Sequence, residues 1–102
     1  MDKKTFSLRL AQLRNNKGVS ARDMSLSMGQ GENYINNIES GISFPSMTGF
    51  FYICEYLKIS PMEFFDFDSK NPAKEKELLS AVKGLANEDL DHLIALARAL
   101  KK

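Results

Sequence analysis

Residues 20–41, with the sequence SARDMSLSMGQGENYINNIESG, constrain the fold of this chain more than any other stretch. Their apolar residues recur at helical spacing in two short blocks, namely Met24 and Met28, then Ile35 and Ile38. Gly29 lies between the blocks, where a residue without a Cβ atom can take positive φ and reverse the chain. Ser25 is small enough to let two backbones approach. The pattern predicts two short helices that cross over a tight turn, as in a helix-turn-helix.

The stretch resembles the Cro/repressor (XRE) family of DNA-binding domains, because Ile35, Ile38, Glu39 and Gly41 match the I-x-x-I-E-x-G ending of that family. The resemblance extends over residues 5–66. It implies an all-α fold, consisting of a five-helix lambda-repressor-like helix-turn-helix domain plus one or two C-terminal helices. We therefore divide the chain into a DNA-binding domain at residues 1–66 and a C-terminal helical extension at residues 67–102, expected to dimerise or brace the protein.

Composition limits the remaining possibilities. A chain of 102 residues with 43% hydrophobic and 26% charged residues predicts one soluble domain with a single core. The longest apolar runs, such as residues 50–54, are shorter than a membrane span, and the N-terminus lacks the apolar stretch of a secretory signal. The single Cys54 cannot form an internal disulfide and is expected to be a small core residue. We expect a cytoplasmic protein without a membrane partner.

Helical spacing and capping residues place the five expected helices of the first domain. They run from Thr5 to Asn16, from the cap at Ser20, from Gly31 or Glu32 to Ser40, from Pro45–Ser46, and from Ser60–Pro61 to near Phe65. The inward positions of the first and fourth helices are Phe6, Leu10, Leu13, Phe50, Ile53, Cys54 and Leu57. These side chains should form the core.

A polar linker at residues 66–71 joins the first domain to the extension. Asn71 and Pro72 are expected to open a sixth helix that ends at Gly84, and Asn87 is expected to cap a seventh. The seventh helix has an apolar stripe, formed by Leu90, Leu93, Ile94, Ala97 and Leu100. Such a stripe must be covered, either by the same globule or by a second subunit. We expect a homodimer, since two-fold symmetric DNA readers need one.

The resemblance also implies which residues contact double-stranded DNA. The solvent face of the third helix should read base edges through Glu32, Asn33, Asn36 and Asn37. Asparagine can bond bidentately to adenine and glutamate can accept from cytosine, although the same polar residues would suit any solvated helix face. The expected phosphate contacts are Arg22, Lys17, Tyr34, Ser40 and Ser43.

The charge of the motif does not favour strong DNA binding. Between Ser20 and Gly41 a single cation, Arg22, stands against three carboxylates. Phosphate neutralisation normally supplies most nonspecific affinity. Relatives often carry glutamine where this chain has Ala21, and lysine or arginine where it has residues 42–44. The cations left near the first turn and on the N-terminal tail are Arg9, Arg14, Lys17, Arg22, Lys3 and Lys4.

Arg14 has a second expected role. The family resemblance implies an ion pair between Arg14 and Glu39, which would tie the first helix to the third. The pair would be structural, and its contribution would be large only if it is partly buried.

Eight of the ten aromatic residues lie between residues 44 and 67. Consecutive helical residues are about 100° apart, so residues 50–52 cannot all point inward. We expect the C-terminal helices to cover this surface, together with the outward Leu26; the alternative is a partner-protein or self-association surface.

We do not expect an enzyme. The one histidine, His92, lies on a charged helix face, and no nucleophile, metal or cofactor site is apparent. Two function classes remain, and the first is a sequence-specific transcriptional regulator, a repressor acting as a homodimer. The second is a helix-turn-helix fold that serves as a protein-interaction or antitoxin-like module with weak DNA binding.

Overall fold

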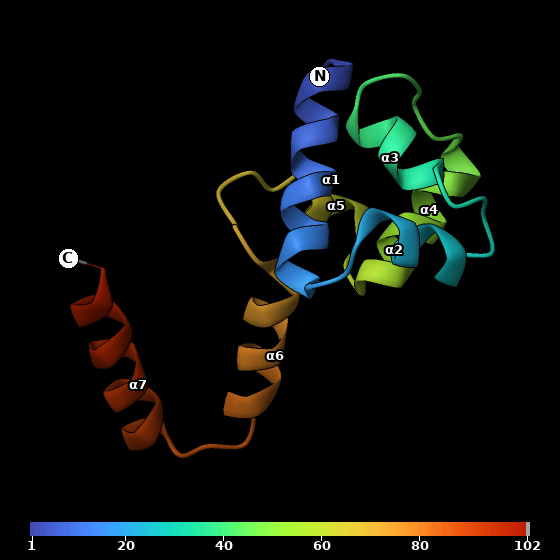
Figure 1. Ribbon diagram of the computed structural model, residues 1–102. Helices are drawn as coiled ribbons and strands as arrows, with labels where there is room; N and C mark the ends of the chain where they lie inside the picture. The colour runs from blue at the N-terminus through green and yellow to red at the C-terminus, as the bar shows by residue number, and fades with distance from the viewer. Residues whose placement is uncertain (102) are drawn as a thin grey trace.

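The computed structural model describes residues 1–101, which form helices and, over that range, no strand (Figure 1). The expected all-α class is thereby confirmed. The helices are α1 (Lys3–Lys17), α2 (Ala21–Ser27), α3 (Tyr34–Glu39), α4 (Met47–Leu57), α5 (Pro61–Phe64), α6 (Pro72–Val82) and α7 (Asn87–Leu100). The first five gather into a globule, and α6 and α7 project from it (Figure 1).

The buried apolar core lies within the globule. The core residues are Phe6, Leu10, Leu13, Met24, Ile35, Ile38, Phe50, Ile53, Cys54, Leu57, Ile59 and Phe64. The expected inward residues of the first and fourth helices are therefore confirmed, as are three of the four inward residues of the second and third. Met28 is only half-buried, because it is the C-terminal cap of α2, where the chain turns away from the core.

Side-chain caps fix most helix starts. The Ser20, Ser46, Ser60 and Asn71 side chains each accept a backbone N–H from the first turn of the following helix. Asp2 caps α1 in the same way, so this helix begins two residues before the expected Thr5. The predicted cap at Asn87 is wrong. Ala86 occupies the cap position, since its carbonyl already accepts the N–H of Leu90 at 3.0 Å.

The extension does not cover the aromatic surface that it was expected to cover. No side chain of α7 is buried, and the molecule is elongated, with principal extents of 50 × 26 × 22 Å. The aromatic residues Phe44, Phe51, Tyr52, Phe65 and Phe67 remain between 41% and 53% exposed, and Leu26 is exposed as well. The expectation of intrachain packing is therefore wrong, because α6 and α7 lead away from the globule (Figure 1).

None of the helices within residues 1–101 has the length and apolar character needed to cross a membrane.

Candidate nucleic-acid interface

The α2–α3 pair is held together by apolar contacts and by one buried hydroxyl. Met24, Ile35 and Ile38 are buried between the helices and the rest of the core. The Ser25 side chain is fully buried; its hydroxyl donates to the Ala21 carbonyl at 2.7 Å and accepts the Ile35 N–H at 2.9 Å. Ser25 therefore does more than permit close approach, since it satisfies a backbone donor in the first turn of α3.

The turn between the two helices follows the sequence prediction, but α3 begins later than expected. Gly29 has φ of 75°, and the Gln30 N–H returns to the Ser25 carbonyl at 2.9 Å. The start predicted at Gly31 or Glu32 is wrong. The Tyr34 N–H donates to the Gly31 carbonyl at 3.1 Å, so the chain makes one more turn before the helix.

The four residues expected to read bases differ in their exposure to solvent and in their place relative to α3. Glu32 and Asn33 are exposed in the turn before α3, and Asn36 is exposed on the helix itself. Asn33 occupies the N-cap position without a side-chain hydrogen bond to the backbone. Asn37 is half-buried, and its carbonyl accepts the N–H groups of Ile42 and Ser43 at 3.0 and 3.2 Å. Three exposed polar side chains therefore remain to meet a ligand.

The expected phosphate contacts are similarly divided. Ser40 and Ser43 are exposed at the C-terminal end of α3 and in the loop after it. Arg22 lies 3.4 Å from Glu32, and both side chains are more than half exposed, so this ion pair is easily exchanged for another partner. In this pair Arg22, which was expected to contact phosphate, neutralises Glu32, which was expected to read a base.

Tyr34 is packed rather than presented to solvent. It is half-buried, and burial raises the pKa of its phenol. A Cβ atom at Gly49 of α4 would lie 2.5 Å from the Tyr34 hydroxyl. Gly49 therefore allows the ring of Tyr34 to rest against α4, which supports the orientation of α3.

Arg14 and Glu39 form the interaction expected between them. Arg14 Nε lies 2.7 Å from Glu39 Oε2 and Nη2 lies 2.9 Å from Oε1, a bidentate arrangement that ties α1 to the last turn of α3. The two side chains are 15% and 12% exposed. Hydrogen bonding to Glu39 raises the pKa of Arg14. A further bond from Arg14 Nη1 to the Val19 carbonyl, at 2.8 Å, fixes the loop before α2.

Arg9 was counted among the cations free to bind phosphate, and this expectation is wrong. Its side chain is 3% exposed, and its guanidinium donates to four backbone carbonyls over distances of 2.5 to 2.8 Å. These carbonyls belong to Phe64, Ser69, Glu63 and Asp66. Arg9 thus holds the end of α5 and the linker that follows, and it is not available to an external anion.

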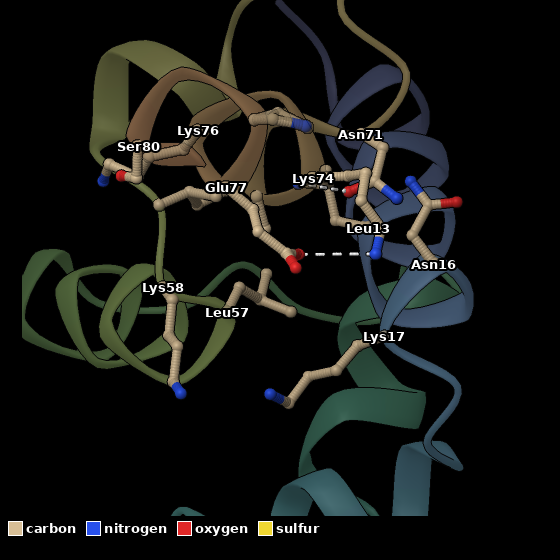
Figure 2. A pocket seen from close by; sticks show the side chains of 13 residues that line it. Leu13, Asn16, Lys17, Leu57, Lys58, Asn71, Lys74, Lys76, Glu77 and Ser80 are labelled. Atoms are coloured by element: carbon tan, nitrogen blue, oxygen red, sulfur yellow. Dashed lines mark hydrogen bonds and ion pairs between the residues drawn. The ribbon is translucent and has the colours of Figure 1, made fainter. Parts of the chain in front are cut away.

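Four exposed lysines, Lys17, Lys58, Lys74 and Lys76, lie together on another part of the molecule. A cavity of about 400 Å³ lies where α6 meets α1 and the end of α4 (Figure 2). Lys17 and Lys58 extend toward one edge of the cavity, and the Lys74–Glu77 ion pair, at 3.3 Å, lies on its α6 side (Figure 2). The Lys17 ammonium also lies 5.0 Å from the centre of the Tyr56 ring. Lys17 therefore belongs to this lysine-lined cavity beneath α6.

The aromatic surface is continuous with the core. The ring centre of exposed Phe44 lies 5.5 Å from the ring centre of buried Phe6. The ring centres of Phe51 and Phe65 lie 6.1 and 5.4 Å from that of buried Phe50. Phe44, Phe51 and Phe65 thus each pack against a buried ring and stay partly exposed. The position of the surface on the globule leaves it available to a partner.

The apolar stripe of α7 is uncovered. Leu90 is half-buried, whereas Leu93, Ile94 and Leu100 are 40%, 47% and 77% exposed, and Ala97 is exposed too. Because α7 contributes no buried side chain, the globule does not cover the stripe.

Metal-ligating side chains and the single cysteine were the remaining candidates for a chemical site. Residues 1–101 bring together no three metal-ligating side chains of the His, Cys, Asp or Glu type. Burial raises the pKa of the Cys54 thiol to about 11, so the thiolate is scarce at neutral pH. No family model matches the chain, and comparisons with curated proteins and with solved structures also give no match. The resemblance to the Cro/repressor family stays a prediction.

Proposed function

We propose that this chain is a sequence-specific DNA-binding regulator of transcription, acting as a repressor and as a homodimer, with a lambda-repressor-like helix-turn-helix fold. The observation that supports this proposal best is the fixed α2–α3 pair. The buried Ser25 hydroxyl, the Gly29 turn and the Arg14–Glu39 ion pair hold the pair rigidly, while Glu32, Asn33 and Asn36 stay exposed. A short helix fixed on a scaffold, with exposed amide side chains, suits the major groove of DNA.

A second function has an observation in its favour. The aromatic surface is exposed, and residues 20–41 carry few cations. An exposed apolar surface of this kind suits a protein partner. In this alternative the α2–α3 pair serves as a scaffold for a protein-interaction or antitoxin-like module, with weak DNA binding. The salt dependence of DNA binding and the effect of substitutions before and on α3 separate the two functions.

DNA binding should depend only weakly on salt. Arg9 and Arg14 are held by internal bonds, and Lys17 lies at the cavity beneath α6. The cations left near the N-terminal half of the globule are Arg22 and two lysines, Lys3 and Lys4, which lie in the first turn of α1 and not on a tail as expected. With about three phosphates neutralised per subunit, log K against log salt should have a slope near −3 per subunit. Anisotropy titrations of a labelled duplex at four salt concentrations measure it. A slope near −10 per subunit would contradict this distribution of cations.

Base reading should be lost without loss of folding. Asn33 and Asn36 are exposed, and Asn33 makes no capping bond, so Asn33→Ala and Asn36→Ala should barely change the melting temperature. On the preferred duplex each substitution should weaken binding by about 1–3 kcal/mol and relax base choice at one position.

The matched control for these two variants is Asn15→Ala, which removes the same amide from an exposed position on α1. It should leave affinity and base choice unchanged. An equal loss for the Asn33 and Asn36 variants on preferred and random duplexes would show that these residues do not read bases.

A further inference from the structure

The uncovered stripe on α7 is accompanied by an asymmetric charge pattern on the same helix. The first turn contains Glu88 and Asp89, followed by Asp91, whereas the last turn contains Arg98. Lys101 follows Leu100, the last residue of the helix. A parallel pairing of two such helices sets acid against acid and base against base, while an antiparallel pairing sets acid against base at both ends. The helix is therefore complementary to an inverted copy of itself.

Two of these charges also border the stripe on one side. Asp91 and Arg98 are seven residues apart, close to two helical turns, so they lie on the same flank. Asp91 precedes Ile94 by three residues and Arg98 follows it by four, which places both next to Ile94 at the edge of the stripe. Both side chains are exposed, and neither has an ion-pair partner within residues 1–101.

Symmetry determines which flanks meet. When a two-fold axis relates two antiparallel helices, a flank of one helix faces the same flank of the other. Asp91 of one copy then faces Arg98 of the second copy, and the contact occurs twice. The same register aligns the stripe with itself in two kinds of apolar pair, Leu90 opposite Leu100 and Leu93 opposite Ala97 of the second copy.

We propose that α7 binds α7 of a second copy of this chain in antiparallel orientation, with Asp91 of each copy facing Arg98 of the other. The proposal deepens the homodimer named above and rests on it. One antiparallel register pairs the apolar residues of the two stripes and also brings Asp91 of each copy near Arg98 of the other. This agreement favours a second copy over an unrelated partner. The aromatic surface is not part of this contact and stays free.

Charge reversal tests the pairing in solution, without DNA. Asp91→Arg places arginine against arginine twice, and Arg98→Asp places aspartate against aspartate twice. Each variant should raise the dimer dissociation constant about tenfold by sedimentation equilibrium. The double variant Asp91→Arg with Arg98→Asp restores opposite charges and should return the constant to that of the unmodified chain. An equimolar mixture of the two single variants should do the same.

The control is Glu88→Arg, which makes a similar charge change on the helix face opposite the stripe. This variant should change the dimer dissociation constant far less than either single variant does, and circular dichroism should show equal helix content for all variants. Unchanged dimerisation of both single variants would overturn the pairing while leaving the homodimer in place. A monomeric unmodified chain at tens of micromolar would overturn both the homodimer and this pairing, whereas DNA binding is measured independently.

Disulfide formation tests orientation directly. Antiparallel pairing brings a cysteine at position 93 next to one at position 97 of the second copy. A mixture of Leu93→Cys and Ala97→Cys chains should therefore cross-link under mild oxidation, while each variant alone should cross-link poorly. Native Cys54 does not interfere, because it is buried. Efficient cross-linking of the Leu93→Cys variant with itself indicates parallel helices and would overturn the proposal.

Discussion

Replacement of Arg9 with alanine should lower the free energy of unfolding by about 3–4 kcal/mol, since four backbone carbonyls would lose a charged donor in a buried site. The carbonyls of Glu63, Phe64, Asp66 and Ser69 all face this guanidinium. Water cannot replace it fully where the side chain is only 3% exposed. Urea unfolding followed by circular dichroism gives the change.

Arg9→Lys should recover only part of this stability, because a lysine ammonium cannot match the geometry of the guanidinium with its five donors. The matched control is Arg22→Ala, which removes an exposed arginine and should change the free energy of unfolding by less than about 0.5 kcal/mol. Equal effects at the two positions would mean that the Arg9 contacts do not stabilise the fold.

Disruption of the Arg14–Glu39 pair should lower the free energy of unfolding by about 2–3 kcal/mol for either alanine variant. The pair is bidentate and mostly buried, and removal of one partner leaves the other charge poorly solvated. The loss of unfolding free energy in the double variant should be smaller than the sum of the losses in the two single variants. Denaturation of all four proteins completes the double-mutant cycle.

The exposed Arg22–Glu32 pair provides the comparison for this cycle. Its separation is 3.4 Å, but solvent screens it, so its coupling should be below about 0.5 kcal/mol. Similar coupling energies for the two pairs would contradict the structural role that burial gives to Arg14 and Glu39.

The sequence predicted the core and most helix ends because these depend on local patterns. Apolar spacing identified Phe6, Leu10 and Leu13 on α1, and the Ser20 and Asn71 caps are local as well. The later start of α3 was missed, because it depends on a turn closed by the Gly31 carbonyl. That bond requires no particular side chain.

The role of Arg9 was missed although the sequence contained a signal. Arg9 follows Phe6 by three residues and precedes Leu13 by four, so it falls within the inward stripe of α1. A charged residue on that stripe requires buried partners. Its partners are carbonyls about 55 to 60 residues away, which no local pattern can identify.

The course of the extension was also beyond local patterns. The helix α6 and its Asn71 cap were predicted, but the direction in which it leaves the globule depends on the contacts of Arg9 with the linker. As a result the stripe on α7 and the aromatic surface are both uncovered, and two surfaces are left for partners.

Selection from a pool of random duplexes by the purified chain tests the central proposal most directly. The account predicts enrichment of a two-fold symmetric sequence, with half-sites about 34–36 Å apart, or a multiple of that distance. The chain carrying both Asn33→Ala and Asn36→Ala should lose the preference within each half-site while it stays folded. Absence of enrichment at low salt, or the same preferred sequence for the double variant, would contradict the proposal that this chain reads DNA through Asn33 and Asn36.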